Sequence, residues 1–174
     1  MTKHDFKLHT LETAPEPSRK DLTDIKRKFG RVPNFFAVTA ESPAAINAYV
    51  SLSDIFRTTA LTPTEQQIVI LTASVENKCG YCVAAHSKGA KMAGVAEDVI
   101  NAIRNRVPLN DARTEALRRL VSQIVDKRGW LSDADVQAFL DQGYSKSQLL
   151  DVMVGVSMKT LSNYINHLTN PPME

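Results

Sequence analysis

The stretch LTPTEQQIVILTASVENKCGYCVAAHSKGAKMAG, residues 61–94, holds a strong helix start signal and both cysteines of the chain. At its beginning, Thr62 is a capping residue, Pro63 suits the first helical position, and Glu65 is placed to complete a capping box. Apolar residues then recur at helical spacing to about Asn77. A further helix, or a kinked continuation, is expected to begin at the cysteines. These residues predict a helical fold built around a cysteine-bearing segment.

Helical spacing extends over the rest of the chain, with no persuasive run of period-2 alternation bounded by turn residues. The expected fold class is therefore all-α. Residues 1–17 are expected to form an extended arm, because Pro15 and Pro17 disfavour a helix there. Residues 18–170 are expected to form a single multihelical domain. Its other helices should start near Ser18, Pro33, Ser42, Ala96, Asn110 or Asp111, Ser132 and Ser145, and the last should reach about Thr169.

Size and charge indicate one soluble globular protein. The chain has 174 residues with 43% apolar side chains, and its 21 basic residues are interleaved with 19 acidic ones. A net charge of +2 without a basic stripe argues against nucleic acid as a partner. The longest apolar runs, 68–71 and 152–156, are far shorter than the roughly 20 residues that span a membrane. The first residues also lack an apolar signal-peptide core, so we expect a cytoplasmic protein with no membrane partner.

The two cysteines and a histidine share one side of the predicted helix. Cys79, Cys82 and His86 fall at i, i+3 and i+7, and the last two are direct i,i+4 neighbours. A helix N-terminus favours negative charge and can draw the pKa of such thiols well below ~8.5. Cys82 should be the better thiolate, and Cys79 is placed to attack whatever forms on it and close a disulfide. The spacing therefore favours redox chemistry.

Two other interpretations of the C-x-x-C-x-x-x-H pattern remain. The residues could be structural, as two small apolar side chains and an exposed histidine. They could also bind zinc, with a fourth ligand from His4, His9 or His167, although no second ligand pair is present. Covalent haem attachment is excluded because Val83, not histidine, follows the second cysteine. The absence of a βαβ pattern argues against a thioredoxin fold.

The quoted stretch resembles the carboxymuconolactone decarboxylase and AhpD-like alkylhydroperoxidase family, specifically its peroxidase-related members. Residues 61–65, 77–86 and 91–94 carry most of the likeness, and residues 31–36 and 160–167 add to it. The resemblance implies an AhpD-like, all-helical fold that assembles as a homotrimer or homohexamer. It further implies a peroxidase that uses no cofactor such as haem or flavin, and no metal.

The resemblance also implies roles for individual residues. In the family's peroxidases the second cysteine attacks the hydroperoxide, the first resolves it as a disulfide, and the histidine belongs to a proton relay. These positions are Cys82, Cys79 and His86. The family's relay glutamate, twelve residues before the first cysteine, is replaced here by Gln67, which accepts no proton at neutral pH and can only orient a water or the ring. Glu76, one turn before Cys79, is the candidate substitute.

The partners expected from the resemblance are a hydroperoxide substrate and a protein that supplies electrons. No nucleotide-binding glycine loop is present, so the electrons must come from another molecule. The resemblance implies that this donor is a lipoyl-bearing or thioredoxin-like protein. The family's decarboxylase branch does not depend on a cysteine pair, which makes a small cyclic acid the weaker substrate hypothesis. A non-catalytic zinc or oligomerisation module is the alternative from another class.

Overall fold

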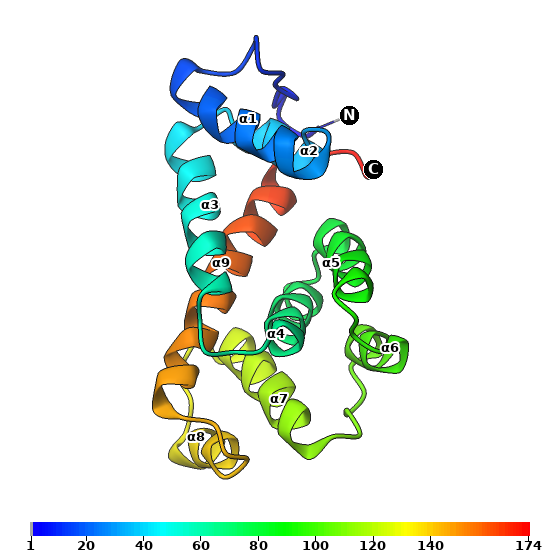
Figure 1. The fold of residues 1–174 in the computed structure, drawn as a ribbon, viewed down its shortest axis with the longest axis vertical. Coiled ribbons are helices and arrows are strands. Elements are labelled where there is room, and N and C mark those ends of the chain that lie inside the picture. The colour runs from blue at the N-terminus through cyan, green and yellow to red at the C-terminus, as the bar shows by residue number, and fades with distance from the viewer. Residues whose placement is uncertain (1) are drawn as a thin grey trace. The chain divides into compact units, whose positions relative to one another are not determined.

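The computed structural model describes residues 2–174 and confirms the all-α prediction. Across these residues it contains nine α-helices and no β-strand (Figure 1). Their bounds are α1 Glu16–Phe29, α2 Asn34–Thr39, α3 Pro43–Arg57, α4 Pro63–Glu76, α5 Gly80–Met92, α6 Glu97–Asn105, α7 Ala112–Asp126, α8 Asp133–Leu140 and α9 Lys146–Thr169. Within the described residues, no helix is both long and apolar enough to cross a membrane.

The helices form two compact units, which are described separately. One comprises residues up to 54 together with 164–174, and the other comprises residues 55–163. The boundaries therefore fall inside α3 and α9. The expected division into an arm, residues 1–17, and a domain, residues 18–170, stays a prediction.

In the first unit, α1 begins earlier than predicted. The helix starts at Glu16, with Pro15 as its N-cap and Pro17 inside the first turn. The expectation that both prolines exclude a helix there is wrong for Pro17, because the first turn of a helix has no use for the missing N–H. Ser18, expected to cap the helix, is instead buried and donates from Oγ to the carbonyl of Ala40 at 2.8 Å.

In the second unit, α4 is the central helix and packs against α5, α6 and α7. Every residue from Ile68 to Val75 is buried, as expected of a helix that is surrounded on all sides. Its start follows the sequence signal: the Thr62 side chain accepts from the amide of Glu65 at 3.2 Å, and the Glu65 carboxylate accepts from the amide of Thr62 at 2.8 Å. The predicted capping box is confirmed.

A tight turn separates α4 from α5 and sets the start of the cysteine-bearing helix. Lys78 has φ of 56°, in the left-handed region that usually favours glycine. The amide of Lys78 donates to the carbonyl of Val75 at 2.9 Å, and the amide of Cys79 donates to the carbonyl of Ser74 at 3.0 Å. These two bonds form a Schellman motif. Residues 61–94 are thus two separate helices, with Cys79 as the N-cap of α5.

A glycine allows α9 to pack closely in this unit. A Cβ built on Gly155 would lie 2.6 Å from Cε2 of Phe56 and 2.8 Å from Cγ1 of Val69, which is closer than side-chain atoms approach. The absence of that Cβ brings the backbone of α9 against α4. Lys159 lies one turn further along α9, on the same face as Gly155.

Candidate active site

Both cysteines lie at the N-terminus of α5, as the sequence predicted. Cys79 is the N-cap, and Cys82 lies in the first turn. The two residues are thiols in this structure, with exposed fractions of only 2% and 4%. A hydrogen bond between their side chains raises the pKa of Cys79, so the sulfurs face one another. The site is a buried dithiol.

The surroundings of Cys79 favour its protonated form. The hydrogen bond to Cys82, then burial, then the negative charge of Cys82 raise the pKa of Cys79 above its ordinary value. The expectation that the helix N-terminus lowers the pKa of the pair is therefore wrong for Cys79, because these causes outweigh the helix dipole. Cys79 stays protonated and acts as the hydrogen-bond donor.

His86 lies one turn after Cys82 on α5 and contacts a lysine that the sequence analysis did not single out. Its Nε2 is 2.7 Å from Nζ of Lys159. Burial, and then the charge of Lys159, hold the pKa of His86 well below its ordinary value. The ring is therefore neutral near pH 7. Since a lysine ammonium can only donate, Nε2 is the acceptor and the ring proton is assigned to Nδ1.

Lys159 belongs to this cluster, and sequence reasoning did not identify it. It lies on α9, is 1% exposed, and also donates from Nζ to Oγ of Ser162 at 2.9 Å. Burial lowers its pKa, while the charges of Cys82 and Cys79 and a hydrogen bond to Cys82 act in the opposite direction. The available signal was a lysine at i+3 from Val156 and i+7 from Val152, two apolar residues at helical spacing. Buried lysines are rare and need a partner, and here Cys82 is one.

The two predicted relay positions have different surroundings. The Oε1 atom of Gln67 is buried without a hydrogen-bond partner among residues 2–174, and it lies 3.9 Å from where a Cβ on Gly89 would be. Glu76 is held elsewhere: it accepts from Oγ of Ser122 at 3.0 Å and lies 3.4 Å from Nε of Arg106. The structure thus brings together Cys79, Cys82, His86 and Lys159, whereas Glu76 pairs with Ser122 and Arg106. The relay role of Gln67 stays a prediction.

The geometry gives the zinc interpretation no support. Over the described part of the chain, no group of three or more His, Cys, Asp or Glu side chains is arranged to hold a metal ion. Of the histidines considered as a fourth ligand, His9 pairs with Glu41 at 2.9 Å and His167 stacks on Tyr164.

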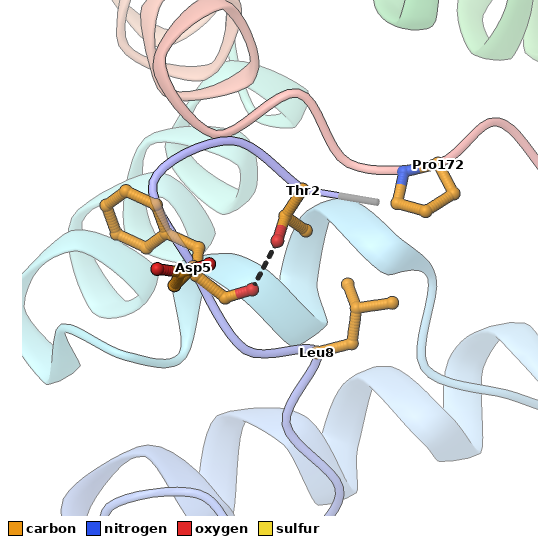
Figure 2. A pocket seen from close by; sticks show the side chains of 5 residues that line it. Thr2, Asp5, Leu8 and Pro172 are labelled. Atoms are coloured by element: carbon orange, nitrogen blue, oxygen red, sulfur yellow. Dashed lines mark hydrogen bonds between the residues drawn. The ribbon is translucent and has the colours of Figure 1, made fainter.

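A surface hollow in the first unit contains none of these residues. It has a volume of about 430 Å³ and is lined by Thr2, Asp5, Phe6, Leu8 and Pro172, with the Thr2 hydroxyl donating to the carbonyl of Phe6 at 2.6 Å (Figure 2). With no thiol and one carboxylate in its lining, it offers no redox chemistry. We therefore place the candidate site at the dithiol.

The neutral state of His86 predicts an acid-sensitive fold. The unfolded chain binds a proton at this residue with a pKa of about 6.5, whereas the folded chain binds it only at lower pH. The stability contribution is therefore present above pH 6.5 and is lost as the pH falls. By pH 5.5 the loss is expected to be up to about 1.4 kcal/mol. Urea unfolding at pH 7.5, 6.5 and 5.5 measures it, with His86→Gln as the comparison. Equal pH slopes in the two proteins would contradict a neutral His86 ring in the folded chain.

A protein-family model matches the part of the chain that carries the cysteines. The sequence model described as the carboxymuconolactone decarboxylase family matches residues 40–123, which include α4, α5 and both cysteines. Residues 40–123 match the sequence pattern of the carboxymuconolactone decarboxylase family. The resemblance stated from the sequence is confirmed, and the buried dithiol lies inside this family region. No curated protein matches the chain by sequence.

Solved structures share the fold of this family region and of nearly the whole chain. The alkylhydroperoxidase AhpD core structure, an uncharacterized peroxidase-related protein from Ralstonia eutropha JMP134, superposes with a TM-score of 0.85 at 20% identity, over 98% of this chain and 94% of that one. An uncharacterized peroxidase-related protein from Silicibacter sp. TM1040 has a TM-score of 0.84 at 19% identity, over 99% and 92%. The debrominase Bmp8 was solved as a cysteine-to-alanine variant in complex with 2,3,4-tribromopyrrole. It superposes with a TM-score of 0.79 at 16% sequence identity, over 99% of this chain and 92% of that one. The fold is AhpD-like.

Proposed function

We propose that the protein reduces hydroperoxides through its buried dithiol. Cys82 attacks the terminal peroxide oxygen, which releases an alcohol and leaves a sulfenic acid on sulfur. Cys79 then attacks that sulfur, which closes the disulfide and releases water. The observation that carries this proposal is the hydrogen bond between the two side chains, with Cys79 protonated and Cys82 beside Lys159.

Burial of the dithiol restricts the substrate. With Cys79 and Cys82 only 2% and 4% exposed, a slender hydroperoxide reaches the sulfur more easily than a bulky one, after local opening at the first turn of α5. Gly80, which lies between the cysteine positions and is exposed, has no atom within 4 Å of its Cβ position. The space beside Gly80 is therefore open.

A dithiol is the reductant that returns the site to its starting state. The disulfide is regenerated by exchange, and a lipoyl-bearing or thioredoxin-like protein supplies two thiols in one step. The proposal includes assembly as a homotrimer or homohexamer and needs no bound cofactor, because the two sulfurs store both electrons.

Turnover tests the proposal. The purified protein is expected to consume an organic hydroperoxide when reduced lipoamide or a reduced thioredoxin-like protein is present, and to do so more slowly with a monothiol. Consumption at the rate of buffer with every donor would contradict it. Loss of a small cyclic lactone acid that persists in the double Cys→Ser variant would instead support a decarboxylase of the same family.

A second candidate function uses the same sulfurs. The debrominase Bmp8 shares this fold over 99% of the chain and has been captured with 2,3,4-tribromopyrrole in a cysteine variant. Reductive removal of bromide from that compound is therefore tested beside peroxide consumption, with free bromide as the readout. Bromide release that exceeds peroxide consumption at matched concentrations would favour the dehalogenase.

A further inference from the structure

We propose that Lys159 is the catalytic acid of this site: it pairs with the Cys82 thiolate and delivers the proton that the departing peroxide oxygen needs. This inference rests on the proposed function and names a residue for it on α9, outside the family region of residues 40–123.

The hydrogen bonds around Nζ fit an ammonium. Ser162 Oγ donates its own proton to the carbonyl of Lys159 at 3.1 Å, so it can only accept from Nζ at 2.9 Å. The neutral ring of His86 accepts at 2.7 Å, and Cys82 is the third partner. An ammonium has three protons to donate, and three acceptors surround it. We assign the thiol proton of the reduced site to Lys159, with Cys82 as the thiolate, because this assignment gives each of the three contacts a donor and an acceptor.

The carboxylates of α4 are unavailable for this role. Glu65 completes the capping box and lies 3.3 Å from Nε of Arg113, while Glu76 pairs with Arg106. Gln67 stands where the family relay has an acid, and its carbonyl oxygen has no partner among residues 2–174. The charged or titratable groups that act on Lys159 are Cys82, Cys79 and His86, all from α5 or its N-cap. A buried amine thus takes the place of the missing carboxylate.

The reaction balances with this residue as the acid. The Cys82 thiolate displaces the alkoxide of the hydroperoxide, and the alkoxide takes a proton from Lys159, so an alcohol leaves and the amine becomes neutral. The thiol of Cys79 then attacks the sulfenic acid, and its proton leaves with the hydroxyl as water. Together the two sulfurs lose two electrons, and the peroxide gains these two electrons. When a dithiol reductant opens the disulfide, its two protons return to Cys79 and Lys159.

Burial makes the proton transfer favourable at the right moment. Lys159 is 1% exposed, so its charge is supported mainly by the thiolate. Once sulfur has been oxidised, that negative charge is gone and the neutral amine is the preferred state of a desolvated lysine. The close packing at Gly155 and the bond to Ser162 hold the amine in place throughout.

Two variants of Lys159 separate its effects. Lys159→Met removes the charge with similar side-chain volume, and Lys159→Arg keeps a charge that does not release its proton. Lys88→Met, an exposed position on α5, is the matched control. The first measurement is the pH dependence of iodoacetamide alkylation at Cys82, located by mass spectrometry in the full chain. The second is the single-turnover rate with an organic hydroperoxide at pH 7. Thermal melting followed by circular dichroism verifies that each variant is folded.

The expected results differ between the variants. Lys159→Met should raise the alkylation midpoint of Cys82 by about 1 to 3 pH units and slow the peroxide step by roughly 100-fold. Lys159→Arg should keep the low midpoint yet still lose about 100-fold in the peroxide step, because it cannot act as an acid. Lys88→Met should match the parent in both measurements.

A merely structural lysine would give another pattern. The proposal is overturned if Lys159→Met folds, keeps the parental alkylation midpoint of Cys82 and reacts with peroxide within about twofold of the parental rate. If Lys159→Met does not fold, a parental peroxide rate in Lys159→Arg overturns the proposal instead. If the midpoint shifts but the parent itself never reacts with hydroperoxides, the proposed function and the acid step fall, while the pairing of Lys159 with Cys82 is supported.

Discussion

Replacing Cys82 by serine is expected to reduce hydroperoxide turnover to the rate of buffer. A serine hydroxyl is not ionised at neutral pH and cannot be oxidised to a sulfenic acid, so neither the attack nor the electron transfer has a substitute. The loss should be at least about 1000-fold. Consumption of an organic hydroperoxide with reduced lipoamide as the donor measures it.

The control for this variant is Ala84→Ser, which adds the same hydroxyl to an exposed position on α5. It should retain the parental rate. If Cys82→Ser also retains it, the thiol mechanism is wrong, whatever the other residues of the site contribute.

Replacing Cys79 by serine is expected to interrupt the cycle after the first chemical step. Cys82 keeps Lys159 and His86, so it still reacts once with peroxide, but the sulfenic acid has no resolving thiol. Turnover with a dithiol should fall by roughly 100-fold or more, while dimedone labels one cysteine per chain in a protein treated with one equivalent of peroxide. Rapid quench followed by mass spectrometry measures both.

The same experiment checks which cysteine is attacked. If Cys79→Ser prevents the first oxidation and Cys82→Ser allows it, the roles of the two residues are reversed. That outcome would also contradict the structural asymmetry in which Cys79 is the protonated partner.

Helix starts were predictable because their signals are local. Three predicted helix starts are confirmed as N-caps. The side chains of Thr62, Asp111 and Ser132 each accept a hydrogen bond from the amide three residues later. Such bonds depend on a few neighbouring residues and need no knowledge of the fold. The same locality placed Cys79 and Cys82 at the N-terminus of a helix.

Other features were not predictable because they depend on distant contacts. The left-handed turn at Lys78 is a separate case, because local backbone hydrogen bonds close it but no glycine announces it. The pKa of Cys79 is raised by burial and by Cys82, which the helix position alone does not reveal. Lys159 reaches His86 from 73 positions away in the chain, so spacing within one helix could not identify it. The sequence predicted that Cys79, Cys82 and His86 lie on one side of a helix, and the structure adds Lys159 beside them.

The central claim is that peroxide joins Cys79 to Cys82, and one measurement tests it most directly. The reduced protein is treated with one equivalent of an organic hydroperoxide, its thiols are titrated, and the digested chain is analysed by mass spectrometry. The account predicts that both thiols disappear together and that the peptides containing residues 79 and 82 lose two hydrogens through an internal bridge. Two thiols that still titrate after denaturation, with no bridge in the digest, would show that the buried sulfurs do not react and would contradict the account.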